Sequence, residues 1–180
     1  MRVFKDVKRA MKKREVLLLK IFSAVLVLFI GGISLSTSFR GNVVESLSSI
    51  YGSVLVSLTN RDRTLLNISE LKVSPILEKA AQMKADDMAK KGYFSHNTPD
   101  GKTPWYWIDL VDYKYVVAGE NLAVNFNESE NVQNAWMNSP THRANIVNSK
   151  FTEIGIASST GIYKGREAVF VVQLFATPAK

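Results

Sequence analysis

Residues 74–92 read SPILEKAAQMKADDMAKKG and carry the clearest local signal in the chain. Ser74 is a good helix N-cap, and the proline that follows it suits the first helical position. Apolar side chains then recur at the 3.6-residue helical period, with Lys84 as the one polar member of the stripe. Gly92 supplies a stop. The stretch predicts an amphipathic helix between Pro75 and Gly92.

The C-terminal part predicts a hairpin. Residues 154–157 and residues 168–175 (AVFVVQLF) are rich in β-branched and aromatic side chains, which favour strands. Gly161 and Gly165 mark the predicted turn between them. Three further helices are predicted from apolar spacing, caps and stops: one over residues 54–66, one starting at Thr103-Pro104, and one from near Ser129 to about Asn138.

Helices that come first and a hairpin that comes last predict an α+β fold with segregated layers. Trp105, Trp107 and Trp136 lie on the predicted helices among apolar residues, so we expect them in the core rather than as ligand platforms. With 180 residues, 46% of them apolar, the chain has room for about one domain.

The basic charge of the chain gathers at its N-terminus. Residues 1–20 hold eight basic and two acidic side chains, so they contribute +6 of the net charge of +7. The rest of the chain is nearly neutral and shows no basic face for nucleic acid, so we predict no nucleic-acid partner. The absence of cysteine excludes disulfides, cysteine-ligated zinc and thiol catalysis.

Residues 16–35 form an apolar run, VLLLKIFSAVLVLFIGGISL, in which Lys20 is the single charge. A helix of about 20 apolar residues spans the roughly 30 Å hydrocarbon core of a bilayer. The basic cluster precedes the run, so the positive-inside rule places the N-terminus in the cytoplasm. We predict a cytoplasmic segment over residues 1–15, one transmembrane helix (a signal anchor) over 16–37, a tether over 38–52 and an extracytoplasmic domain over 53–180.

Two other interpretations of the apolar run are open. A cleaved signal peptide has a shorter apolar region and a small-x-small cleavage site, for which Ser34-Leu35-Ser36 would serve. A buried core helix would show its apolar residues on one face, whereas here they occur all round. The anchor and the signal peptide both place the domain outside the cell.

Three residues are candidates for chemistry: His96, Glu120 and His142. Two imidazoles and a carboxylate are a ligand set that zinc accepts, with a fourth position left for water. The same three groups could form an acid/base pair with an orienting carboxylate. They could also be structural histidines and a salt-bridged glutamate. Both histidines lie in polar, loop-like contexts, and no local motif places them on one face of a helix.

Several short motifs occur together in a fixed order. They are NRDR at 60–63, LEKAAQMKADDMAKKGYFSH at 77–96, PDG at 99–101, AGENL at 118–122, AWMNSPTHRANI at 135–146, FTEIGIA at 151–157 and VVQLF at 171–175. In these motifs the chain resembles the CAP superfamily (cysteine-rich secretory, antigen 5 and pathogenesis-related proteins), in its cysteine-free bacterial SCP-like branch. The resemblance covers essentially the whole soluble domain, and it implies a three-layer α-β-α sandwich with a central antiparallel sheet.

The resemblance also implies a cleft with two histidines, which can bind zinc, and two glutamates. His96, Glu120 and His142 match three of these positions, and Ser139 stands where the second glutamate would be. By this resemblance His96 and His142 would hold a metal, with zinc the expected ion. Supporting roles are expected for three further residues, with capping and salt bridging as the alternative: Asn121 holding the loop of Glu120, Asn145 doing the same for the second loop, and Arg63 pairing with a carboxylate or orienting the cleft.

The function expected from these features is that of a binding module at the cell surface, anchored in the membrane by one span. Its partner would be an extracellular protein, a lipid or a cell-wall polymer. One alternative is a zinc-dependent hydrolase of peptides or cell-wall material, in which Glu120 acts as base on a zinc-bound water. In that case Glu120→Gln should abolish turnover and leave zinc affinity largely intact. A third alternative is a structural surface protein whose cleft is a relic.

Overall fold

The computed structural model describes residues 51–179. The predicted transmembrane helix at 16–37 lies outside the described residues, as does the tether up to residue 50. Within residues 51–179, no helix combines the length and the apolar character needed to cross a membrane.

Five helices and four strands make up the described part of the chain. The helices are residues 51–65, α2 (Pro75–Lys91), α3 (Trp105–Leu110), α4 (Ser129–Asn138) and α5 (Pro140–Ile146). The strands are β1 (Lys72–Val73), β2 (Tyr115–Val124), β3 (Glu153–Tyr163) and β4 (Arg166–Pro178).

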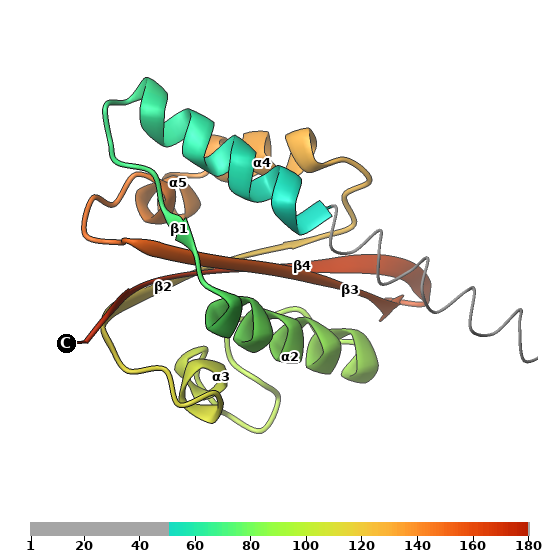
Figure 1. Cartoon of the computed structure of the whole chain (residues 1–180). Helices are drawn as coiled ribbons and strands as arrows, with labels where there is room; N and C mark the ends of the chain where they lie inside the picture. The colour runs from blue at the N-terminus through green and yellow to red at the C-terminus, as the bar shows by residue number, and fades with distance from the viewer. Residues whose placement is uncertain (1–50, 180) are drawn as a thin grey trace, which may run out of the picture. The chain divides into compact units, whose positions relative to one another are not determined.

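The strands form one sheet in the order β1-β3-β4-β2. The three long strands are antiparallel to their neighbours, and β1 adds two residues parallel to β3. The predicted antiparallel sheet is thus confirmed for the three long strands, and the sheet as a whole is mixed because the chain runs beside β3 on its way into α2. Helix 51–65, α4 and α5 lie on one side of the sheet, and α2 and α3 lie on the other (Figure 1).

Helix α2 confirms the prediction made from its end signals. Proline occupies its first turn, and Gly92 ends it in the left-handed conformation (φ 69°), where its N–H donates to the carbonyl of Met88. Ser74 stands at the N-cap position, but its side chain makes no capping hydrogen bond. The helix end is thus set by the backbone preferences of proline and glycine.

The hairpin is longer than predicted, and its turn contains Gly165, as predicted, but not Gly161. Lys164 and Gly165, both at positive φ, connect β3 to β4, while Gly161 lies within β3. A Cβ atom at Gly161 would lie 2.4 Å from the carbonyl oxygen of Ala89, so this glycine lets α2 lie close against the strand. The predicted turn at Gly161 was therefore wrong: this glycine serves a helix–strand contact.

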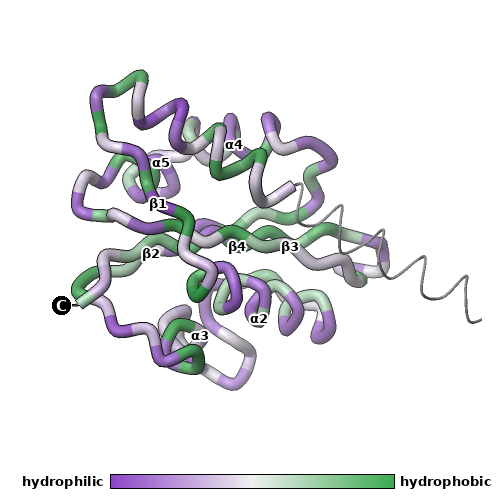
Figure 2. The backbone as a smooth tube through the Cα atoms, in the orientation of Figure 1, coloured by the Kyte–Doolittle hydropathy of each residue, from purple (hydrophilic) through white to green (hydrophobic). Residues whose placement is uncertain are grey.

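Two apolar clusters occupy the two faces of the sheet, and β4 contributes alternately to both. Phe170, Val172 and Leu174 join the cluster beneath α2 and α3, while Val171 and Phe175 join the cluster beneath helix 51–65, α4 and α5. Side chains alternate between faces along a strand, so a strand covered on both sides is apolar almost throughout. Figure 2 shows this as a largely hydrophobic stretch along the strands between helices of mixed colour.

The contact between α2 and β3 leaves no room for a side chain at Gly155. A Cβ atom there would lie 2.3 Å from the backbone nitrogen of Glu78. We expect Gly155→Ala to lower the free energy of unfolding by about 3 kcal/mol, the upper end of the usual overpacking cost. The control is Thr160→Ala at an exposed position of the same strand, with an expected cost below about 1 kcal/mol. Urea unfolding measures both, and equal effects would contradict the close contact.

Candidate functional site

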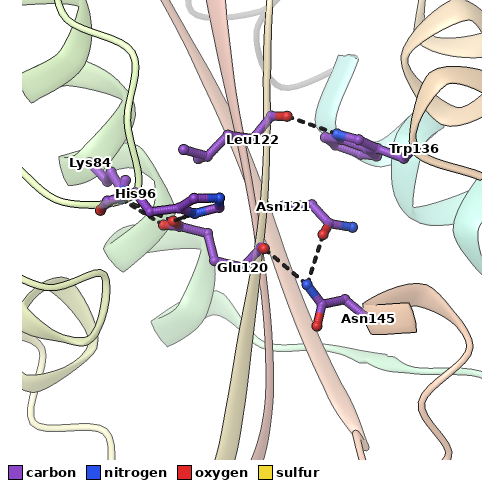
Figure 3. A network of polar contacts seen from close by, with 7 residues as sticks. All are labelled: Lys84, His96, Glu120, Asn121, Leu122, Trp136 and Asn145. Carbon is purple, nitrogen blue, oxygen red and sulfur yellow. Dashed lines mark hydrogen bonds and ion pairs between the residues drawn. The ribbon is translucent and has the colours of Figure 1, made fainter. Parts of the chain in front are cut away.

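The candidate site lies at the open edge of β2, the last strand of the sheet. Consecutive side chains of a strand point to opposite faces. Glu120 therefore points toward α2 and the loop that carries His96, whereas Asn121 points toward α5 and Asn145 (Figure 3). The strand edge thus joins two groups of polar side chains that come from opposite layers.

His96 is held by the carboxylate of Glu120. Its Nδ1 lies 2.6 Å from Oε1 of Glu120, while the side chain of His96 is 56% exposed. The loop that carries it is closed by Thr98, whose hydroxyl and backbone N–H pair with the backbone of Lys102. The imidazole therefore has a fixed orientation and a face open to solvent.

A buried ion pair lies beneath His96. The Lys84 ammonium contacts both carboxylate oxygens of Glu120, at 3.1 Å from Oε1 and 2.8 Å from Oε2, and the side chains of the two residues are 0% and 2% exposed. The contact to Oε2 is an ion pair without hydrogen-bond alignment. Lys84 also donates to the backbone carbonyl of His96. Burial lowers the pKa of Lys84, and the charge of Glu120 opposes this shift.

Sequence reasoning did not find this role for Lys84. The available signal was a lysine inside the apolar stripe of α2, since a lysine is rarely fully buried unless it is paired. The identity of its partner carried no local signal, because Glu120 lies 36 residues further along the chain.

His142 is held by a neutral partner. It lies in α5, and its Nδ1 is 2.8 Å from the hydroxyl oxygen of Ser139, the residue at the expected position of a second glutamate. Burial, together with the nearby His96, lowers the pKa of His142 below its ordinary 6.5. A loop position was expected for His142. That expectation was wrong because Pro140 begins α5 as well as ending α4.

Two asparagines tie α5 to the edge of β2. Asn145 donates from Nδ2 to the carbonyl of Glu120 (3.0 Å) and to Oδ1 of Asn121 (2.9 Å), and Asn121 donates to the carbonyl of His142 (3.1 Å). The indole N–H of Trp136 donates to the next edge carbonyl, that of Leu122 (2.9 Å). Side chains here take the place of a neighbouring strand (Figure 3).

Arg63 supports α5 from behind the site. Its side chain is buried, and it donates to the backbone carbonyls of Ser69 (2.8 Å), Ile146 (2.8 Å), Asn148 (3.0 Å) and Phe151 (3.4 Å). Ile146 is the last residue of α5, so the guanidinium satisfies carbonyls at the helix C-terminus. The structure places these carbonyls, rather than a carboxylate, around Arg63, so its link to the site runs through the position of α5.

A cavity of about 390 Å³ opens between the two histidines. Its lining includes His96, Glu120, Thr141, His142, Asn145 and Trp105. Trp107 and Trp136 are buried in the core as expected, but Trp105 is only half-buried and forms part of the cavity wall. Trp105 also packs against the apolar cluster beneath α2 and α3, so the expectation of a core role holds for it only in part.

The residues at this cavity that could hold a metal are its two histidines. Nδ1 of each ring is engaged by a protein partner, which leaves Nε2 of each ring as the available ligand atom. Glu120 and Ser139 orient the two rings through these Nδ1 contacts, and partners of this kind are common around metal-bound histidine. Among residues 51–179, no cluster of three or more histidine, aspartate and glutamate side chains is placed to hold a metal ion.

Comparison with known proteins assigns the described domain to a protein family. Residues 56–175 match the profile of the family described as CAP, Cysteine-rich secretory protein family. The chain is 39% identical over 108 residues to the protein YkwD of Bacillus subtilis, a match that covers 60% of this chain and 42% of YkwD.

Two solved structures are similar. One is an extracellular protein containing an SCP domain from Bacillus anthracis, with a TM-score of 0.65 and 26% identity, covering 74% of this chain and 42% of that chain. The other is an outer surface protein of Borrelia burgdorferi, with a TM-score of 0.61 and 29% identity, covering 71% of this chain and 92% of that chain. The chain thus spans less than half of YkwD and of the Bacillus anthracis protein, and most of the Borrelia burgdorferi protein.

The buried ion pair predicts a large cost for removing one partner. Lys84→Met leaves the carboxylate of Glu120 buried without its counter-charge, so we expect a loss of about 3–5 kcal/mol in the free energy of unfolding. The double variant Lys84→Met/Glu120→Gln removes both charges and should be more stable than the single variant. Urea unfolding tests this, and a single variant within about 1 kcal/mol of the wild type would contradict the pairing.

His142 predicts a pH dependence of stability. The unfolded chain protonates His142 as the pH falls through about 6.5, whereas the folded protein keeps it neutral to a lower pH. The unfolded state then binds more protons, so the stability that His142 contributes falls as the pH drops below this value. We expect the wild type to lose more stability than His142→Asn between about pH 8 and pH 5.5 in urea unfolding. Parallel pH profiles would count against the shift.

Proposed function

The chain belongs to the CAP family of cysteine-rich secretory proteins, and on that premise we propose that it is a binding module outside the cell, held at the membrane by its N-terminal apolar run, with a cleft that accepts a divalent metal. The chain itself has no cysteine. The fold of the module therefore rests on its two apolar clusters and its buried polar contacts, without disulfides.

The burial and pairing of the Glu120 carboxylate favour a binding role over a catalytic one. A general base must reach a proton on water or substrate through a carboxylate that is free to accept it. Here the carboxylate is 2% exposed and lies between the Lys84 ammonium and Nδ1 of His96. Service as base in a zinc-dependent hydrolase would require Glu120 to leave both partners, so the geometry favours an orienting role.

His96 and His142 would hold the metal through their Nε2 atoms. A bound divalent ion supplies a Lewis-acidic centre whose remaining positions water or a ligand can fill. Glu120 would fix the ring of His96, and Ser139 would fix the ring of His142. Because the protein would supply only two ligands, the remaining coordination positions of the metal would be filled by water or by a molecule that enters the cavity.

The shape of the cavity supports a partner with mixed character. Trp105 offers a half-buried aromatic wall, while Thr141 and Asn145 offer polar groups near the histidines. Such a site fits the end of a protein chain, a lipid headgroup or a cell-wall polymer that presents an apolar face together with oxygen donors. A cell-surface location rests on the apolar run over residues 16–35 and its basic flank, and two similar proteins are described as an extracellular and an outer surface protein.

Calorimetric titration of zinc into the full-length chain tests the metal site. We expect binding at one site that disappears in both His96→Ala and His142→Ala. Ser139→Ala should weaken the affinity by about 10–100-fold without abolishing it, because the ring of His142 loses its outer partner. Ser95→Ala, an exposed neighbour of His96, serves as the control and should bind like the wild type.

Binding that is indifferent to both histidine substitutions would overturn the metal-binding cleft. A hydrolase assay on peptides and cell-wall material, run with zinc-loaded protein, addresses the catalytic alternative. Turnover that is lost in Glu120→Gln, a variant that must first be shown to fold, would replace the binding role by a hydrolytic one.

A further inference from the structure

A chain of buried side-chain hydrogen bonds runs from the candidate site into the first described helix. Asn121 donates to Oε1 of Gln173 (2.9 Å), Gln173 donates to the hydroxyl of Thr59 (2.9 Å), and Thr59 donates to Oε1 of Gln133 (3.1 Å). Gln133 in turn donates to the carboxylate of Asp62 (2.9 Å). This amide chain, made of Asn121, Gln173, Thr59, Gln133 and Asp62, links β2, β4, α4 and helix 51–65.

The amide chain lies in a place where apolar residues are expected. Thr59, Gln133, Gln173 and Asn121 are all 0% exposed. Gln173 points to the same face of β4 as Val171 and Phe175, in the midst of that apolar cluster. Leaving an amide unpaired at such depth costs about twice what a hydrogen bond contributes, so each member depends on the next.

Groups at both ends fix the direction of the amide chain. At the site, the carbonyls of His142 and Glu120 can only accept, so Asn121 and Asn145 must turn their NH₂ groups toward them. At the other end, the carboxylate of Asp62 accepts from the NH₂ group of Gln133. Every bond between these ends then points the same way, and no amide can flip without breaking its neighbours' bonds.

We propose that Thr59, Gln133 and Gln173 are positioning residues of the cleft. Through Asn121, they hold the backbone of His142 and, as Figure 3 shows for its contact with Asn121, the amide of Asn145. Through these two residues they set the distance between α5 and the edge of β2. Because His96 lies on the opposite side of that edge, this distance determines how the two imidazoles face each other. Helix 51–65, which contributes no residue to the cavity lining, is thereby part of the site. The inference rests on the metal-binding role proposed above.

The substitution that isolates this role is Thr59→Val, which keeps the side-chain shape and removes the hydroxyl. It leaves Gln133 without its donor and Gln173 without its acceptor. Thr59→Ser restores the hydroxyl and serves as the conservative rescue. Leu55→Ala is the matched control, since it weakens the packing of the same helix in the same apolar cluster without touching the amide chain.

Two readouts on the full-length chain test the proposal. In the metal-free protein, we expect Thr59→Val to shift the NMR resonances of the side-chain amides of Asn121 and Asn145 and of the ring nitrogens of His142. In zinc titration, we expect a roughly tenfold weaker affinity, the lower end of the loss seen when outer partners of metal ligands are removed. Thr59→Ser should restore the resonances and the zinc affinity. Leu55→Ala should leave the resonances in place and change the affinity by no more than about twofold.

A Thr59→Val variant that unfolds more easily yet keeps the His142 resonances and the zinc affinity would overturn the proposal, because the amide chain would then be purely structural. Should Thr59→Val fail to fold, Gln133→Met breaks the amide chain one step further from the cleft and is judged by the same readouts. If the wild type binds no zinc, the metal-binding role fails, and the resonances of the metal-free chain still decide whether the amide chain positions His142.

Discussion

The open edge of β2 imposes a requirement on everything around it. An edge strand leaves every second backbone carbonyl and N–H without a strand partner, and burying such groups is costly unless side chains satisfy them. Here the carbonyls of Glu120 and Leu122 accept from the side chains of Asn145 and Trp136. Helices α4 and α5 are therefore attached to the sheet by directed hydrogen bonds as well as by apolar contact, and the cavity forms where this covering gives way to solvent.

The alternation of side chains along the same strand explains why the site has two different halves. Glu120 faces the layer of α2, where its charge is balanced by Lys84 at 2.8 Å. Asn121 faces the layer of α5, where its hydrogen-bond partners are neutral amides and a backbone carbonyl. One half of the site thus contains a compensated ion pair and the other a network of neutral dipoles. The interior tolerates both because, within residues 51–179, the buried charges of Lys84 and Glu120 are paired and all but three buried side-chain polar atoms have a hydrogen-bond partner.

Local signals in the sequence explain which elements could be predicted. The ends of α2 follow from Pro75 and Gly92, whose backbone preferences act regardless of the rest of the fold. The hairpin follows from the composition of residues 168–175. Strand β2, which carries Glu120 and Asn121, had no comparable strand signal in the sequence. These two polar residues interrupt its apolar pattern, because their partners come from the helix layers on either side of the sheet.

The site residues show the same division. His96, Glu120 and His142 could be nominated from residue type and motif order, and the structure brings them around one cavity. The residues that hold these three side chains in place could not be predicted from the sequence. Lys84 pairs with a group 36 residues away, and the buried Arg63 binds backbone carbonyls, which every residue has and which therefore leave no trace in the sequence. Motifs identify chemically active side chains, whereas the groups that orient them depend on tertiary contacts.

The two histidines of the cleft differ in their exposure to solvent and in the partners that orient their rings. His96 is more than half exposed and is oriented by a carboxylate that is itself fixed by a buried lysine. His142 is less exposed and is oriented by a neutral hydroxyl, and burial keeps its pKa low. For the proposed ligand, the ring of His96 would thus be the more accessible of the two, while the position of the His142 ring depends on α5. Since α5 is held by Arg63 at its end and by asparagines along its length, the inner half of the cleft is set by the packing of the whole helical layer.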